Sequence, residues 1–519
     1  SVHIDCLNNL GHLYLAKRDY IKAEQFLLKA MKIISRRKNR KGTLLYFAVS
    51  HNLILCYFRK KEYQQAEKLI STILDRKKQL LGVNHTSYAI TLNLLAAIQH
   101  FQGINGMAES NYKEAINIVE RSMSSNHFDY LMYNMNLAAL YDAQKLYRKA
   151  EPLYSNVVMR LPKYVKDNLF EVNASGRKSF LRYKIIAAYN IYYSFICKYI
   201  QFFSSSNNSK VLSQLYDSHL FIKSFLFNSA QKTKERIFNS GDTALVQQYE
   251  HFIAKRMRYN KLLQRTKAQR KKQGLGIEKL AEEIDQLEKD LARKSNVFAQ
   301  DLEEYQPHTW QEVQQKIKPG EAAIEMIRFQ NFNGINWTDR VYYAALIITP
   351  ESKYPEPVFL TRGNFLEGKG HRYYQRSIGS KTQEGQSYQQ FWQPIQQRLQ
   401  KIYPQAKKLF VSLDGVYHRL NLETLWSPTT KQYLGEMIDI QIVSNTKDLL
   451  KRSPRQDQVK MTHQRAVLFG YPDYKQFNPQ PLSAGNTQTP ERYGTYLNTS
   501  EKRALEDGFD GKNIPNLPH

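Results

Sequence analysis

The chain has 519 residues, of which 42% are apolar, and its formal net charge at pH 7 is +28. A chain of this length is expected to form about three domains of ordinary size, and its apolar fraction excludes disorder throughout. The three cysteines, Cys6, Cys56 and Cys197, show no CxxC spacing, which excludes a disulfide framework and a zinc knot and favours a reducing, cytoplasmic location.

The positive charge is spread along the chain, and short basic runs occur only at residues 36–41 and 267–272. Lysine and arginine side chains that neutralise phosphates gain affinity for nucleic acid by releasing counterions. No nucleic-acid-binding motif accompanies the two runs. We therefore expect a solvated basic surface and no specific nucleic-acid site.

A pattern of small and apolar residues occurs four times in the first third of the chain. Its central alanines, Ala23, Ala66, Ala108 and Ala150, are 43, 42 and 42 residues apart. A small residue lets two antiparallel helices approach closely, and large residues fill the space between neighbouring pairs, so each unit is stable only in a stack. The pattern resembles tetratricopeptide repeats, although the usual period is about 34 residues. We predict an α-solenoid of such repeats at residues 1–165. An all-helical core that only looks periodic is the alternative, and four copies in phase count against it.

A solenoid of this kind binds peptides or proteins on its concave face. The tetratricopeptide template predicts six partner-binding residues there: Asn8, His12, His51, Arg59, Asn93 and His100. Taken singly, each is more typical of a solvated surface position. The chain begins inside the first repeat without a signal peptide, so we expect further residues before Ser1.

Residues 166–304 are predicted to form a helical connector without the 42-residue period. The stretch at 185–203 is the most apolar part of it. This stretch contains Asn190, Lys198 and Gln201, so we predict a buried aromatic helix and no membrane span.

A heptad pattern follows within the connector. Its apolar residues are spaced 3, 4, 3 and 4 positions apart, which is typical of a coiled coil: Ile277, Leu280, Ile284, Leu287 and Leu291. Five positions are few for a stable dimer. We therefore predict that the seam packs inside the protein, as a helical hairpin with residues 245–265, and keep pairing between subunits as the alternative.

The pattern changes to that of an α/β protein near residue 305. Short apolar runs rich in β-branched and aromatic residues alternate with helical or turn segments. The runs lie at Phe329 and at residues 341–349, 358–360, 409–413, 438–443 and 466–470. Their continuous apolar character predicts strands buried on both faces, as in a mostly parallel sheet covered by helices. A helix at residues 388–402 is predicted to cover one face.

The common catalytic and cofactor motifs are absent from this half. It contains no GxxxxGK[ST], GxGxxG, HExxH or GxSxG pattern, and we expect neither a metal nor a cofactor. Residues 368–371 are predicted to form a simple turn, and His418 is predicted to be a turn or surface residue. No cysteine follows Cys197, so no Cys-His dyad can form within this half.

Several short strings occur in this half in the order and spacing of one known family. They are residues 310–313 (WQEV), 318–325 (KPGEAAIE), 342–347 (YYAALI), 409–415 (LFVSLDG), 420–425 (LNLETL), 444–449 (SNTKDL) and 466–474 (AVLFGYPDY). Each string is weak alone. Together they resemble the CHAT family, in which caspase-like domains are joined to tetratricopeptide repeats. The resemblance implies that residues 305–519 form an incomplete caspase-like CHAT domain.

The resemblance also implies a cysteine endopeptidase of the clan that contains caspases and separase, regulated through its repeats. In that clan a cysteine thiolate attacks the scissile carbonyl and a histidine assists proton transfer. The family places both residues downstream of the strand at 466–470. Because the sequence ends at His519, we expect it to stop before this catalytic pair. We assign no catalytic residue and expect no peptidase activity from residues 1–519.

Two functions remain open. The first is a regulated caspase-like cysteine endopeptidase whose repeat domain binds a protein partner or regulator, with a protein as substrate. The alternative is a non-catalytic tetratricopeptide-repeat scaffold with a degenerate CHAT module. Sequence beyond residue 519 distinguishes them, because a His-Gly motif and a cysteine near a strand end favour the first and a natural stop codon favours the second.

Overall fold

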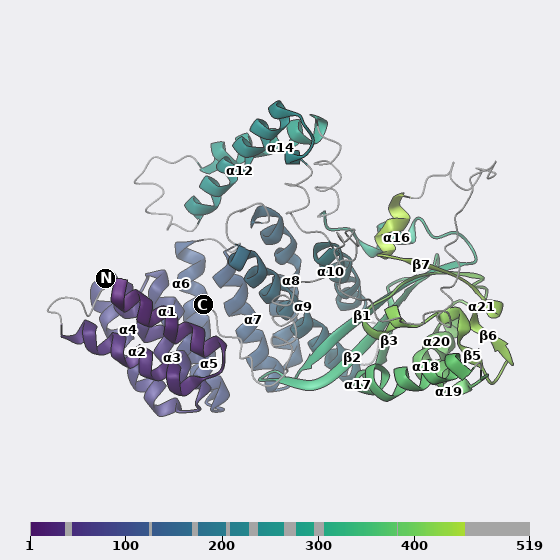
Figure 1. Ribbon diagram of the computed structural model, residues 1–519, viewed down its shortest axis with the longest axis horizontal. Helices are drawn as coiled ribbons and strands as arrows, with labels where there is room; N and C mark the ends of the chain where they lie inside the picture. Colours follow the sequence, from purple (N-terminus) through teal and green to yellow (C-terminus); the bar gives the residue numbers. More distant parts are fainter. Residues whose placement is uncertain are drawn as a thin grey trace, which may run out of the picture.

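The computed structural model describes residues 2–36, 44–123, 127–168, 175–203, 208–227, 237–263, 277–294, 306–380 and 382–451. These residues are helical as far as Lys294 and form a mixed α/β region from Trp310 onward (Figure 1). The predicted fold class, an α-solenoid followed by a helical connector and an α/β region, is confirmed. None of the described helices is both long and apolar enough to cross a membrane.

The N-terminal part is a row of four antiparallel helix pairs. The pairs are α1 (Val2–Ala16) with α2 (Tyr20–Ser35), α3 (Leu44–Arg59) with α4 (Tyr63–Leu81), α5 (Thr86–Phe101) with α6 (Asn105–Ser122), and α7 (Phe128–Ala143) with α8 (Tyr147–Asn168). The four central alanines are fully buried, one on the second helix of each pair. Their burial confirms the predicted register of the repeats.

The turn inside each pair has a feature that the sequence pattern did not predict. Arg18, Lys61, Gly103 and Lys145 follow the first helices at the repeat spacing, and all have positive φ angles of 60°, 64°, 79° and 60°. Only glycine adopts this left-handed conformation without steric cost. Three of the four turns therefore carry a strained basic residue.

The connector comprises four described helices: α9 (Ser175–Phe202), α10 (Ser209–Phe227), α12 (Thr243–Leu263) and α14 (Ile277–Lys294). Tyr189, Tyr192 and Phe195 of α9 are buried, which confirms the predicted aromatic helix. The heptad leucines Leu280 and Leu291 are also buried, and α14 packs antiparallel to α12 in the hairpin at the top of Figure 1. Within this chain the seam of α14 thus packs against α12, and the choice between this packing and pairing of subunits stays a prediction.

A five-stranded mixed sheet forms the C-terminal part. Its order is β3 (Glu356–Leu360), β2 (Trp337–Ile348), β1 (Glu321–Phe332), β4 (Lys408–Ser412) and β7 (Asp439–Val443). The β1, β4 and β7 strands are parallel, whereas β1, β2 and β3 are antiparallel. The prediction of a mostly parallel sheet was wrong for β2 and β3, because a short loop joins β1 directly to β2 and allows only an antiparallel pair. The predicted strand at 466–470 lies outside the described residues.

Helices cover both faces of the sheet. On β1, Ala323 and Ile327 face α9 and α10, while Ala322 and Ile324 face the opposite layer. That layer contains α18 (His371–Ser380), α19 (Gly385–Phe391) and α20 (Gln393–Ile402). The helix predicted at 388–402 is thus two helices, which meet at Trp392 just before Pro394. Residues 368–371 do not form a simple turn as predicted, because they continue a π-helical turn, η2 (Leu366–Gly370), into α18.

The hydrophobic cores show how the parts are connected. The first two helix pairs have a core of their own, completed by residues of α5. Most of the fourth pair and part of the third share one continuous core with α9, α10 and the inner face of the sheet, and other residues of these two pairs form a small cluster of their own. The sheet is therefore packed against the second half of the repeat array through α9.

Candidate functional site

The six predicted partner-binding residues lie on the first helices of the first three pairs. His12 is exposed. The half-buried residues are Asn8, His51 and Arg59. The buried residues are Asn93 and His100. We call the surface built from the first helices of the four pairs, α1, α3, α5 and α7, the first-helix face.

Asparagines connect neighbouring first helices. The Nδ2 of Asn52 donates to the Oδ1 of Asn8 at 2.9 Å, and the Nδ2 of Asn136 donates to the Oδ1 of Asn93 at 3.2 Å. Two of the predicted partner-binding residues thus stabilise the stacking of repeats. The sequence held a signal for this role, because Asn8, Asn52, Asn93 and Asn136 are 44, 41 and 43 positions apart, close to the repeat spacing.

The loop between β1 and β2 covers the first-helix face at the third and fourth repeats. Figure 1 shows these two strands reaching from the sheet to α7. They leave a cavity of about 10 Å³, lined by Phe332, Gly334 and Ile335 on one side and by Ala97, His100, Phe101, Tyr112, Asn136 and Ala139 on the other. This volume holds about one water molecule at most. At these repeats the face is therefore occupied by the chain itself.

Gly334 allows the loop to approach α7 closely. A Cβ atom at this position would lie 2.6 Å from the backbone nitrogen and 2.8 Å from the Cα of Ala143. Its φ angle is also positive, at 102°. Both facts require glycine here, so any side chain at residue 334 must displace the loop from α7.

Side chains of α9 hold the end of β1 in place. The backbone N–H of Phe332 donates to the Oγ of Ser194 at 2.9 Å. The Nζ of Lys198 donates to the carbonyl of Phe332 at 3.2 Å and forms an ion pair with Asp142 of α7. Burial raises the pKa of Asp142, and Lys198 counteracts this effect. Lys198 of the connector thus links the fourth repeat, through its ion pair, to the sheet, through its hydrogen bond.

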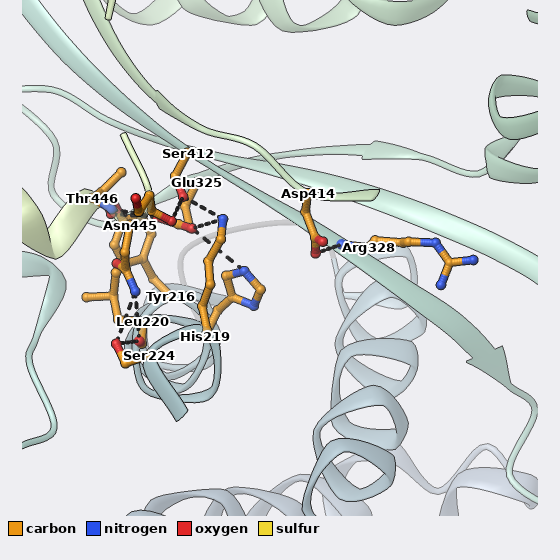
Figure 2. Close-up of polar contacts among 12 residues, drawn as sticks. Tyr216, His219, Leu220, Ser224, Glu325, Arg328, Ser412, Asp414, Asn445 and Thr446 are labelled. Atoms are coloured by element: carbon orange, nitrogen blue, oxygen red, sulfur yellow. Dashed lines mark hydrogen bonds and ion pairs between the residues drawn. The ribbon is translucent and has the colours of Figure 1, made fainter. Parts of the chain in front are cut away.

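A second polar cluster lies between α10 and the sheet (Figure 2). The Nζ of Lys223 lies 2.8 Å from the Oε1 of Glu325 on β1 and also donates to Ser412 on β4. The other carboxylate oxygen of Glu325 accepts hydrogen bonds from the backbone N–H and the hydroxyl of Thr446, at 3.0 and 2.7 Å. Glu325 and Lys223 are both buried. We call this set the Glu325 cluster.

Neighbouring residues extend the Glu325 cluster along α10. The hydroxyls of Tyr216 and Thr446 are 2.8 Å apart, and Asn445 donates to the carbonyl of Leu220 at 3.0 Å. Burial alone would raise the pKa of Glu325, but Lys223 and His219 hold it below its usual value. A buried carboxylate with these partners is suited to fixing a helix on a sheet and has no access for a substrate.

Known sequence families account for both ends of the chain. The tetratricopeptide repeat pattern matches residues 3–37 and 45–121, and the CHAT domain pattern matches residues 385–502. The chain joins tetratricopeptide repeats to a CHAT domain. The match to the CHAT domain begins at α19 and includes β4 and β7, whereas β1 to β3 precede it.

Two solved structures of tetratricopeptide-like repeats, both from a putative kinesin light chain of Podosopora anserina, are similar to part of the chain. One is 17% identical with a TM-score of 0.31 and covers 42% of this chain and 94% of its own. The other, of a variant of those repeats, is 19% identical with a TM-score of 0.29 and covers 36% and 84%. A search of curated proteins found no match.

The strings that resemble the CHAT family converge on the Glu325 cluster. Glu325, Ser412 and Thr446 each come from a different string, and Asp414, which shares its string with Ser412, accepts a hydrogen bond from the backbone N–H of Arg328 at 2.7 Å. The partners of Glu325 on α10, Lys223 and His219, were not predicted from the sequence. Nothing in this largely apolar helix marks them as ion-pair partners of a distant carboxylate.

The buried cysteines are not suited to nucleophilic attack. Burial raises the pKa of both Cys56 and Cys197 to about 12, whereas the reactive form of cysteine is the thiolate. His418 is exposed on η3 (Gly415–Arg419). Among the described residues, no group of three or more histidine, cysteine, aspartate or glutamate side chains is arranged to hold a metal ion.

We expect the protein to lose stability as the pH falls from about 6.5 to about 4. Burial lowers the pKa of both His100 and His219 to about 4. The unfolded chain binds protons on these histidines in this window and the folded chain does not, so the free energy of unfolding falls with pH. Urea unfolding at pH 7, 6, 5 and 4 measures the slope.

Two variants identify the source of this pH dependence. His219→Gln should flatten the slope between about pH 6.5 and 4, whereas a change of the exposed His251 to glutamine should leave it unaltered. Equal slopes for the two variants would contradict the assignment to His219.

Proposed function

We propose that the chain belongs to a regulated caspase-like cysteine endopeptidase whose tetratricopeptide repeats bind a protein partner and whose CHAT domain acts on a protein substrate in the cytoplasm. None of the three cysteines among these 519 residues is assigned as the nucleophile. The presence of a CHAT domain beside the repeats supports the peptidase class, and the absence of CxxC spacing supports the reducing compartment.

The observation that carries the regulatory part is the position of the β1–β2 loop on the first-helix face. Its tip covers the third and fourth repeats, while β1 pairs with β4 of the CHAT domain. A partner that binds along the whole face must displace the tip. Because β1 is continuous with the sheet, displacement changes the support of the CHAT domain. The uncovered candidates Asn8, His12, His51 and Arg59 are proposed as the first partner contacts, and Asn93 and His100 as contacts made after displacement.

We propose a separate role for each of the three parts of the chain. Residues 1–165 form the partner-binding array, residues 166–304 form the connector, and residues 305–519 form the CHAT domain. The connector helix α9 contacts β1 and carries Lys198, which pairs with Asp142 of the array. This arrangement supports a connector that transmits the state of the array to the sheet.

The experiment compares Gly334→Ala with Gly241→Ala in a protein that includes the downstream sequence expected to carry the catalytic histidine and cysteine. The first change places a Cβ against the backbone of Ala143, whereas Gly241, which also has a positive φ of 74°, has nothing within 4 Å. We expect Gly334→Ala to raise cleavage of fluorescent casein by at least about tenfold and the control to leave it unchanged. Cleavage should also be abolished by iodoacetamide, which alkylates thiolates.

The outcomes separate the two functions. If cleavage depends on a thiol but Gly334→Ala does not change its rate, regulation through the loop is contradicted. The assignment as a peptidase then still holds. If the unsubstituted protein and both variants fail to cleave casein, the peptidase proposal is contradicted. The non-catalytic scaffold is then the better-supported function.

A further inference from the structure

The turns inside the four helix pairs lie along one edge of the repeat array. Each helix packs antiparallel to the next one in the chain, so the four first helices run in the same direction and the turns after them end on the same side. These turns, together with the starts of the second helices, are residues 17–22, 60–65, 102–107 and 144–149. We call this strip the turn edge.

Large apolar side chains are exposed on the turn edge. The exposed fractions of four of them lie between 39% and 69%: Ile21, Ile104, Met107 and Leu146. Phe202 at the end of α9 continues the row, because it is 63% exposed and its ring centroid lies 5.2 Å from that of Tyr147 at the start of α8. Single exposed apolar residues are normal on a protein surface, but a group of them marks an interaction site.

The turn edge is also basic. It contains eight lysine and arginine residues and two acidic residues, Asp19 and Glu62. Both acidic side chains form ion pairs with lysines of the edge itself, at 3.2 Å to Lys22 and 2.6 Å to Lys60. The third turn, which holds the exposed Met107, has no charged residue, while the turns on either side of it are basic. The edge thus has an apolar centre flanked by cations.

The backbone of the turns provides a second observation that points to binding. Lys61 and Lys145 adopt left-handed φ angles of 64° and 60°, whereas Gly103 occupies the same place in the third turn. Gly103 shows that the turn accepts the residue type that avoids the steric cost. A cation here also gains from the dipole of the preceding helix, but salt screens this gain at an exposed site. Strained residues cluster at functional sites, and both lysines are exposed.

We propose that the turn edge binds the surface of an anionic lipid bilayer. Basic side chains gain free energy near anionic headgroups, and exposed apolar side chains gain it by entering the boundary between headgroups and acyl chains. A nucleic acid or an acidic peptide would pair with the cations but leave Ile21, Met107 and Phe202 in water. A bilayer is also extended enough to contact all four turns at once, whereas peptides bind solenoids on the concave face. The proposal does not depend on peptidase activity.

Co-sedimentation of the 519-residue chain with lipid vesicles tests the proposal. One set of vesicles is phosphatidylcholine alone, and the other contains about 30% phosphatidylserine. We expect the partition coefficient to be at least about tenfold higher for the anionic vesicles and to fall steeply when the salt concentration rises from about 0.1 to 0.5 M.

One pair of variants tests the apolar centre. Ile104→Ser combined with Met107→Ser should lower the partition coefficient by at least about tenfold. Ile104 is the N-cap residue of α6 and serine is a favourable N-cap, so this variant is expected to fold with an unchanged melting temperature. Met159→Ser, which changes an exposed methionine of α8 outside the turn edge, should leave the partition coefficient unchanged.

A second pair of variants tests the flanking cations. Lys61→Gln combined with Lys145→Gln should lower the partition coefficient by at least about tenfold. Lys32→Gln combined with Lys78→Gln removes the same charge from exposed lysines near the far ends of α2 and α4. This control should change the partition coefficient by less than about twofold, because these lysines lie more than a Debye length from the bilayer.

Each other outcome contradicts the proposal. Absence of binding to anionic vesicles, or equal binding to the two kinds of vesicle, would overturn it. Binding that neither the serine nor the glutamine variant weakens would place the membrane contact elsewhere on the chain. A lower Kd for polyglutamate or for heparin than for the anionic vesicles would assign the turn edge to an acidic protein or to another polyanion.

Discussion

Replacing Lys223 by methionine is expected to lower the free energy of unfolding by about 3–5 kcal/mol, the cost of leaving a buried carboxylate without its counter-ion. The Nζ of Lys223 lies 2.8 Å from the Oε1 of Glu325, and both residues are buried between α10 and the sheet. Methionine keeps the length of the side chain and removes the charge. Urea unfolding at pH 7, followed by circular dichroism, measures the change in midpoint and free energy.

Two further variants test whether the loss comes from the unpaired charge. Lys223→Met combined with Glu325→Met should recover most of the stability, because replacing both partners of a buried ion pair by apolar residues is often close to neutral. Lys289→Met removes an exposed pair with Asp285 on α14 and should change stability by less than about 1 kcal/mol. An equal loss for the Lys223 and Lys289 variants would count against the burial argument.

Replacing Ala108 by tryptophan is expected to destabilise the repeat array by more than about 2 kcal/mol. Ala108 is fully buried on α6, where this helix packs against α5. The close approach of the two helices leaves no space for an indole ring, so the backbones must separate. Thermal unfolding measures the change in melting temperature.

The neighbouring residue supplies a matched control. Met107 is on the same helix and 61% exposed, so Met107→Trp introduces the same side chain on the solvent side. It should change stability by less than about 0.5 kcal/mol. A stable Ala108→Trp protein would contradict the register of the repeats.

The sequence predicted those features that depend on local pattern. The spacing of Ala23, Ala66, Ala108 and Ala150 identified the second helix of every pair, and the heptad leucines identified the hairpin of α12 and α14. Both signals repeat at a fixed period, so several positions support one conclusion. The left-handed turns were missed because three of them lack the glycine that usually marks such a position.

Contacts between distant segments were not predictable in this way. Lys223 and Glu325 are 102 positions apart, and Ser194 and Phe332 are 138 apart. One sequence contains no information on which buried polar groups will meet. His100 was expected to face a partner, and its burial beside the loop could not be foreseen, because the loop comes from residues more than about 200 positions later. Asn93, expected to face a partner as well, is buried and bonds to Asn136 of the next repeat.

The division of the hydrophobic core makes the two halves of the repeat array mechanically unequal. The first two pairs have their own core, whereas the third and fourth share a large part of theirs with α9, α10 and the sheet. In a simple solenoid each repeat opens independently of all but its neighbours. Here the N-terminal half can fray or bend to follow the shape of a ligand, while the C-terminal half opens only together with the α/β region. Under the proposed binding mode, a partner would contact a compliant segment first, and a change made there would reach a segment that opens only as one unit.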